Sequence, residues 1–447
     1  MFIERSSARI RTVRTLFVLL GLVPCAGLCG WAVLRHSSFH RRAIELRCEQ
    51  AFGMPVRIGR VEHVRPDALR LHGCELVAAD GEAVVTAPVV DLESSPTEVR
   101  LRVGRIACSP RLARAATDLV HQWLGQPARF PLDCVVDVGE LSWLATTTSP
   151  APGKDGIGRF LGLRIECVAA EGGRAVRLSG GGSADGAART DELRVLTTTA
   201  AATAAGPPAL RVEVTGALAT PVPVAILEAC LGCDAGALSC GADAVVSGRI
   251  DSTCEGGRWS GTAAGRIEGI DLAAASAWLP HRMSGEASLA IERIDWARGR
   301  IAGCDCRLVA TRGVVEQPLL DALVTGLGCR PGPEYRTAIG ERSRAFDQVA
   351  CRLRIGPSGV DLRADSGARA AIAVVRGGAI LEEPAAAVPL ERVAWLLSPP
   401  TSVAVPASQA TRWLLGAFAE EMLPGGTEAA VRKHSEQAVR PTTRSDF

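Results

Sequence analysis

Residues 55–76 read PVRIGRVEHVRPDALRLHGCEL, and the alternation within them decides the fold. Val56 and Ile58 are separated by one arginine, and Leu69 and Leu71 are separated by another. A repeat of two places successive side chains on opposite faces of a β-strand, so the apolar residues share one face. The stretch therefore predicts two β-strands, each with one buried face and one polar face.

The same two-residue repeat recurs toward the C-terminus. We predict further strands around residue 89 and at 101–103, 135–143, 193–196, 210–214, 244–250, 261–267, 287–291, 304–310 and 349–355. Apolar residues at helical spacing predict short helices at 44–52, 110–124, 223–231, 318–327 and 410–423. Many short strands and few short helices predict a mainly β protein with a large sheet.

Upstream of the strands, residues 15–34 carry no charge and are mostly apolar. A helix of this length spans about 30 Å, the thickness of the hydrocarbon core of a bilayer. A cleaved signal sequence is the alternative, with residues 25–27 (CAG) as the cleavage point, but the apolar run continues through Trp31 to Leu34. We therefore expect an uncleaved single-pass anchor in the inner membrane, with a cytoplasmic N-terminus and the bulk of the chain in the periplasm.

Changes in composition divide the chain into five segments. They are the N-terminus and anchor (1–35), an N-terminal β region (36–180), a low-complexity linker or loop (181–208), a C-terminal β region (209–400), and an amphipathic helix with a tail (401–447). A loop is expected at 146–158, and the polar tail from residue 424 is expected to be disordered.

The overall composition argues against several classes of partner. The 447 residues carry a formal net charge of +2 and no long basic stripe, so nucleic acid is not expected to bind. Aromatic residues make up 4% of the chain and include one tyrosine, too few for the platforms that stack on sugars or bases.

The cysteine content is high, and thirteen of the fifteen cysteines lie beyond the anchor. Cys230 and Cys233 form a C-x-x-C motif, but at the C-terminal end of a predicted helix, where the helix dipole disfavours a thiolate. Three interpretations stay open for this pair. They are thiol-redox chemistry, a structural disulfide to Cys240 or Cys254, and a pair of buried thiols.

The sequence contains no recognisable metal, nucleotide or catalytic motif. Cys304 and Cys306 share a strand face with apolar neighbours, which favours core packing over zinc binding. Two histidines have a nearby partner, His72 with Cys74 on one strand face and His121 with an aspartate one helical turn earlier, but two ligands do not make a metal site. We therefore expect no catalytic residue, metal or cofactor.

Several glycine-containing strand motifs follow the single apolar helix. Residues 52–59 (FGMPVRIG), 69–76 (LRLHGCEL) and 84–92 resemble the opening of AsmA-like envelope proteins, in which a helix ends in glycine and a strand pair follows. Similar to the C-terminal strands of that family are residues 216–218 (GAL), 257–259 (GRW), 265–272 (GRIEGIDL) and 346–349 (FDQV). The resemblance extends over about half of the chain.

This resemblance implies a membrane anchor that carries an elongated β-sheet curled into an apolar groove, of the AsmA/TamB-like type. It implies a non-enzymatic protein that binds or passes phospholipid along the groove or supports outer-membrane and envelope homeostasis. One alternative is a structural or assembly component of a secretion or envelope complex that binds partner proteins. A more distant alternative is a thiol-redox protein using Cys230 and Cys233. A two-residue repeat does not distinguish an open groove from a closed core.

Overall fold

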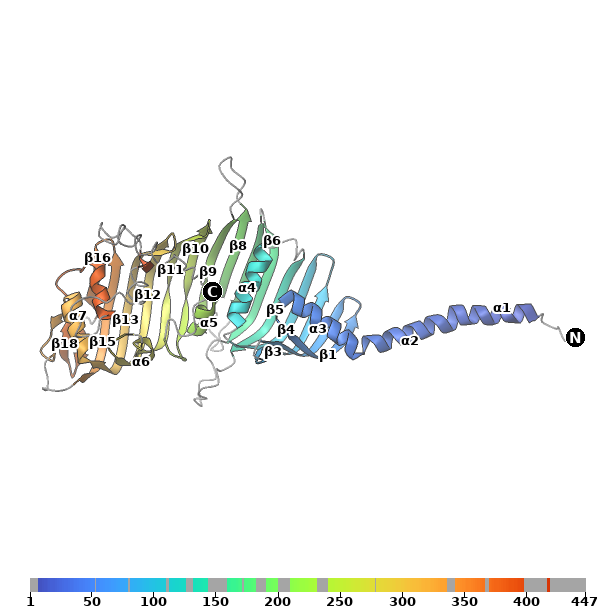
Figure 1. The fold of residues 1–447 in the computed structure, drawn as a ribbon, viewed down its shortest axis with the longest axis horizontal. Helices are drawn as coiled ribbons and strands as arrows, with labels where there is room; N and C mark the ends of the chain where they lie inside the picture. Colours follow the sequence, from blue (N-terminus) through green and yellow to red (C-terminus); the bar gives the residue numbers. More distant parts are fainter. Residues whose placement is uncertain are drawn as a thin grey trace, which may run out of the picture.

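A long β-sheet and an N-terminal helix that projects from one end of it make up the molecule (Figure 1). The computed structural model describes residues 7–52, 54–78, 81–109, 112–125, 132–143, 159–170, 173–181, 190–199, 210–230, 240–277, 279–335, 342–365, 370–397 and 416–418. Within these residues the strands lie side by side across the long axis (Figure 1). The prediction of a mainly β chain with an apolar N-terminal helix is confirmed.

The helical elements are α1 (Ser7–Phe17), η1 (Val18–Leu22), α2 (Val23–Arg35), α3 (Ser38–Phe52), α4 (Leu112–Gly125), α5 (Val224–Cys230), α6 (Leu272–Ala275), α7 (Gln317–Leu327) and η2 (Leu390–Leu397). The strands of the first half are β1 (Val56–Arg65), β2 (Ala68–Val77), β3 (Ala83–Ser94), β4 (Glu98–Cys108), β5 (Asp133–Trp143), β6 (Phe160–Ala170), β7 (Gly173–Gly181), β8 (Thr190–Thr199) and β9 (Leu210–Pro223). Those of the second half are β10 (Val245–Glu255), β11 (Arg258–Asp271), β12 (Met283–Ala297), β13 (Arg300–Glu316), β14 (Arg330–Pro331), β15 (Ser343–Gly356), β16 (Gly359–Ala364), β17 (Ala371–Val375) and β18 (Gly378–Glu382).

The elements α1, η1 and α2 follow one another directly and include a candidate membrane span. Within Arg11–Arg35 the most apolar window of 18 residues has a mean hydropathy of 2.2, and none of that window is buried inside the protein. By length and composition this helix can cross a bilayer. The stretch predicted as the anchor, 15–34, lies within it.

The sheet is a meander in which each strand from β1 to β13 pairs with the next one in the chain. These pairings are antiparallel except for β4 and β5, which are parallel and joined by a crossover through α4. At the far end β13 pairs with β15, which also pairs with β16 and β17, and β18 pairs with β17 and β14. Consecutive strands are therefore neighbours along most of the sheet.

The range 181–208, predicted to be a linker or loop, contains a full strand of this sheet. The short strand predicted at 193–196 is part of β8, Thr190–Thr199, which pairs with β7 and with β9. The sheet therefore includes residues 190–199, where backbone pairing on both sides supports a Thr-rich strand. The predicted loop at 146–158 and the tail from residue 424 lie outside the described residues, as does most of the helix predicted at 410–423.

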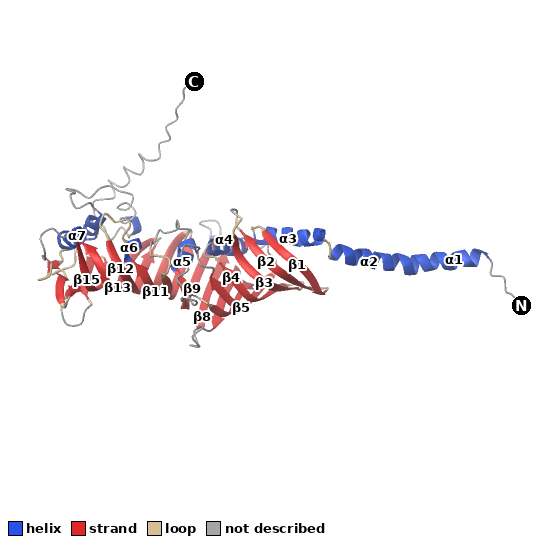
Figure 2. Cartoon of the chain, turned by 90° about the horizontal axis from the view of Figure 1, so that it is seen from below, coloured by secondary structure: helices blue, strands red, loops and turns tan. Residues whose placement is uncertain are grey.

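Helices α3 to α7 lie along one face of the sheet, which we call the inner face (Figure 2). Their apolar sides form buried clusters with it. Leu124 of α4 packs with Cys167 and Val176 of β6 and β7, and Leu320 of α7 packs in the large cluster under β10 to β18. Ile44 of α3 packs on β1 and β2. The faces that the two-residue repeat predicted to be buried are therefore covered, in large part, by helices of the same chain.

A line of glycines, which we call the glycine crease, crosses the first part of the sheet. On β5, Val138 and Leu141 both pack in one core cluster, so the inward positions step by three residues instead of two. Such a step reverses the alternation and bends the strand, as a β-bulge does. The step recurs at matching positions on neighbouring strands, and the glycines there are Gly59, Gly73, Gly104, Gly139 and Gly162.

Two local constraints explain the glycines at the crease. Gly73 and Gly162 have φ angles of 60° and 63°, which side chains with a Cβ rarely adopt. A Cβ built on Gly139 would lie 2.5 Å from the carbonyl oxygen of Gly104, whereas a Cβ on Gly104 would meet nothing within 4 Å. The first contact is between two backbones, so no side-chain rotation can relieve it.

The sheet edge at β1 is covered by α3. The carboxylate of Glu45 accepts a hydrogen bond from the backbone N–H of Ile58 at 3.0 Å, and Arg41 donates to the carbonyl oxygen of Gly59 at 3.1 Å. Glu45 is buried and forms an ion pair with Arg42 at 3.2 Å. These contacts satisfy edge groups that would otherwise be open to another strand, and they fasten the helix after the anchor to the sheet.

Replacing Glu45 with alanine is expected to loosen α3 from β1. The N–H of Ile58 would lose its acceptor, at a cost of about 1–3 kcal/mol, so its amide should exchange with deuterium roughly tenfold faster or more. Hydrogen–deuterium exchange on the full chain measures this rate. Gln50→Ala, at an exposed position of the same helix, is the control and should leave the Ile58 amide protected. An unchanged exchange rate of the Ile58 amide in Glu45→Ala would contradict the proposed role of Glu45 in fastening α3 to β1.

Candidate functional site

One row of residues on the inner face continues across the sheet from β2 to β16. Residues that are paired directly across neighbouring strands share a face, so the row can be followed from one pairing to the next. In order it consists of Leu69, Leu92, Leu101, Val136, Ile165, Leu178, Leu193, Gly216, Ile250, Ala263, Ile294, Cys304, Ile355 and Val360. We call it the apolar row. At about 4.8 Å per strand it extends for roughly 60 Å.

The apolar row is half-buried over nearly its whole length, from Leu69 to Ile355. Near its first end it packs under α3, and Val136 and Leu178 pack in the cluster that includes Ile226 of α5. Near its last end Ile355 packs with residues of η2. Helices of the chain therefore cover both ends of the row.

The middle of the row differs from its ends. Six consecutive members of the row, from Leu193 to Cys304, belong to none of the buried apolar clusters formed by the described part of the chain. We call them the open segment, and they are Leu193, Gly216, Ile250, Ala263, Ile294 and Cys304. It is the longest part of the apolar row outside the clusters of the described residues, and it is the candidate binding surface.

Small residues flank the open segment on the same face. Two residues further along each strand lies a second row on the same face. In it Val214 is opposite Ser252, Ser252 is opposite Gly261, and Gly261 is opposite Trp296. Serine and glycine occupy two consecutive positions of this row, Ser252 is 2% exposed, and Trp296 borders them on β12. Small side chains therefore lie beside the larger apolar ones of the open segment.

The opposite, outer face carries cross-strand ion pairs. Arg70 contacts Asp91 at 2.7 Å, and Arg352 contacts Asp305 at 2.7 Å. The hydrogen bond from each arginine holds the pKa of its aspartate below the ordinary value. These groups are partly exposed, so their pairs make the outer face polar without contributing much to stability. The sheet is thus charged on one side and apolar on the other.

One carboxylate, Asp191, lies on the inner face and is 1% exposed. It accepts hydrogen bonds from the backbone N–H groups of Ala219 at 2.6 Å and Thr220 at 2.8 Å, and from the Thr220 hydroxyl. The carboxylate therefore holds the backbone of β9 in place at residues 219–220. Sequence reasoning did not single it out, because the range around it was interpreted as a linker.

Of the cysteines singled out from the sequence, the structure describes Cys304 and Cys306 in full. Cys230 is the last residue of α5, and Cys233 lies outside the described residues, so the three interpretations of that pair stay open. Cys306 is buried, as expected for packing, whereas Cys304 is half-buried in the apolar row and lies outside the buried clusters of the described residues. The two largest causes that raise the pKa of the Cys306 thiol are, first, its hydrogen bond with Cys304 and, second, burial.

Among the described histidines, His40 and His63 lie 3.2 Å apart between their Nε2 atoms. His72 contacts Glu62 at 3.1 Å across the β1–β2 pair. No group of three or more His, Cys, Asp or Glu side chains in the described part of the chain could hold a metal ion.

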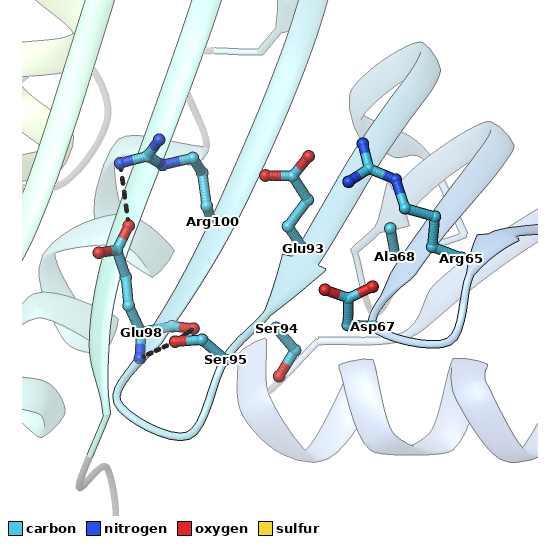
Figure 3. Close-up of a pocket in the computed structure, with 8 residues that line it drawn as sticks. All are labelled: Arg65, Asp67, Ala68, Glu93, Ser94, Ser95, Glu98 and Arg100. Carbon is cyan, nitrogen blue, oxygen red and sulfur yellow. Dashed lines mark hydrogen bonds and ion pairs between the residues drawn. The ribbon is translucent and has the colours of Figure 1, made fainter.

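A small polar pocket lies between the turns that join β1 to β2 and β3 to β4 (Figure 3). Its volume is about 280 Å³, and it is lined by Arg65, Asp67, Ala68, Glu93, Ser94, Ser95, Glu98 and Arg100. Glu98 contacts Arg100 at 3.1 Å, and its backbone N–H donates to Ser95 at 2.9 Å (Figure 3). These contacts stabilise the turn, and the mixed charges favour no single ligand.

The described residues thus define a mainly β chain with one long sheet and an N-terminal helix able to span a membrane by length and composition. Comparison with known proteins found no matching family model, no similar curated protein and no similar solved structure. The function is therefore argued from the sheet itself.

Proposed function

We propose that the protein is a single-pass, membrane-anchored envelope protein of AsmA-like type that binds phospholipid acyl chains along the apolar row. The observation that supports this proposal is the continuity of the row over fourteen strands, with a middle section outside the buried clusters of the described residues. The protein acts by holding lipid and not by catalysing a reaction.

Transfer of a hydrocarbon chain out of water explains why such a row must be continuous. An acyl chain of ~16 carbons gains on the order of 13 kcal/mol on leaving water, at about 0.8 kcal/mol per methylene. A single polar gap along the row would expose part of the chain and forfeit part of this gain. The apolar row has no charged residue from Leu69 to Val360.

The position of the anchor fits the same proposal. α3 follows the apolar helix after a short turn and is fastened to β1, the first strand of the sheet. In an inner membrane, with the sheet in the periplasm, the β1 end of the row would lie nearest the bilayer. Lipid would then enter or leave the sheet at that end.

Photo-crosslinking of the full chain in cells tests this proposal. A benzophenone amino acid is placed at Ile294, in the open segment, and cell lipids are labelled with radioactive phosphate. We expect irradiation to transfer label to the protein. Arg293 precedes Ile294 on β12, lies opposite Asp305 in the sheet register and forms an ion pair with Asp295 on the outer face. The same substitution at Arg293 is the matched control and should transfer none.

Two outcomes would contradict the lipid proposal. Equal labelling from both positions would mean that lipid contacts the protein without selecting the inner face. A crosslink from Ile294 only to protein, without phosphate label, would favour the structural or assembly role in which the same surface binds a protein partner.

A further inference from the structure

Cys134 and Cys167 are directly opposite each other in the sheet. The register of β5 with β6 pairs them across the antiparallel strands, and both are thiols in this structure. Opposed residues in such a pair have Cα atoms about 4.5–5.5 Å apart, which is within the range that a disulfide spans. The other cysteines discussed above, Cys304 and Cys306, follow each other on one strand and lack this geometry.

We propose that Cys134 and Cys167 form a cross-strand disulfide that staples β5 to β6. The two side chains share the inner face, because Cys167 is buried and Cys134 packs against it in the cluster beneath Leu124 of α4. β5 is also the strand that enters the sheet through the parallel crossover, so the disulfide would fix a strand that is joined to its other neighbour, β4, by a helix and not by a hairpin. This inference is independent of lipid binding.

The chemistry requires a disulfide oxidant, and oxidised glutathione is sufficient. The Cys134 thiolate, from the more exposed of the two residues, attacks one glutathione sulfur and releases one glutathione thiolate. The Cys167 thiolate then attacks the sulfur of Cys134 and releases the second glutathione. The two cysteines lose two protons and two electrons, and two reduced glutathione molecules form.

Burial makes this reaction slow at neutral pH. It raises the pKa of Cys134 to about 11 and also raises the pKa of Cys167. Because only the thiolate attacks, the rate of disulfide formation should increase roughly tenfold per pH unit between pH 7 and 9. Once formed, the bond lies under α4 and should resist reduction in the folded chain.

Peptide mapping of the full-length chain in detergent tests the proposal. The protein is incubated with oxidised glutathione, free thiols are blocked with N-ethylmaleimide, and the digest is analysed by mass spectrometry. We expect one linked peptide pair containing Cys134 and Cys167. Complete N-ethylmaleimide labelling of both residues at pH 9, or a link from either of them to a third cysteine, would overturn the proposal.

A stability measurement separates the staple from incidental oxidation. The oxidised wild-type chain should melt at a higher temperature than the reduced chain, and this difference should vanish in Cys134→Ala. Cys108→Ala, on the neighbouring strand β4, is the matched control and should keep the difference. A difference that survives in Cys134→Ala would also overturn the proposal, and the mapping of the wild-type chain does not depend on whether either variant folds.

Discussion

Replacing Gly139 with alanine is expected to destabilise the first half of the sheet by roughly 3 kcal/mol. The new Cβ would lie 2.5 Å from the carbonyl oxygen of Gly104 on the parallel neighbour strand. Backbone must move to relieve this contact, and the movement would break ladder hydrogen bonds between β4 and β5. Urea unfolding of the full chain in detergent, followed by circular dichroism, measures the change.

Gly104→Ala is a closely matched control for this prediction. Gly104 and Gly139 face each other in the crease and both are exposed, but a Cβ on Gly104 would meet nothing within 4 Å. The control should change stability by less than about 0.5 kcal/mol. Equal effects of the two substitutions would show that close backbone approach is not what selects glycine at the crease.

Replacing Ile250 with glutamate is expected to remove most of the phospholipid that co-purifies with the protein, to less than about a tenth of the wild-type amount. Ile250 lies at the centre of the open segment, and an ionised carboxylate there would have to be desolvated against hydrocarbon, at a cost of several kcal/mol. Mass spectrometry of lipids extracted from equal amounts of protein gives the ratio.

Ser247→Glu provides the same new side chain on the same strand but on the outer face. Ser247 pairs with Arg266, which is exposed, so the added carboxylate would have a cationic neighbour and solvent. This variant should retain its lipid. Loss of lipid in both variants would indicate general damage to β10, and retention in both would place the lipid elsewhere on the protein.

Strand periodicity predicted the β architecture but not its bends. Val56, Ile58, Leu69 and Leu71 lie on the inner side of β1 and β2, as the alternation predicted. The glycine crease was not predicted, because the sequence of a single strand does not distinguish Gly59 from an ordinary residue on the polar face. Its role depends on the glycine opposite it on the next strand, and that pairing is set by register.

The same reason limits what the sequence reveals of the candidate site. Leu193 and Ile250 could each be assigned to a strand, yet nothing within either strand indicates that they fall in one row. Likewise, Cys134 and Cys167 are far apart in the chain and meet only through the pairing of β5 with β6. The helices α4 and α7 were predicted, but the face they cover could not be known before the strands were aligned.

Because the sheet is a meander, its length is set by the number of its strands. Because each strand from β1 to β13 lies beside its sequence neighbour, inserting or deleting one hairpin would lengthen or shorten the sheet by roughly 10 Å and leave every other pairing intact. Length can therefore evolve in small steps without redesign of the ends. The distance that the sheet extends from the N-terminal helix therefore depends on the number of strands in the chain.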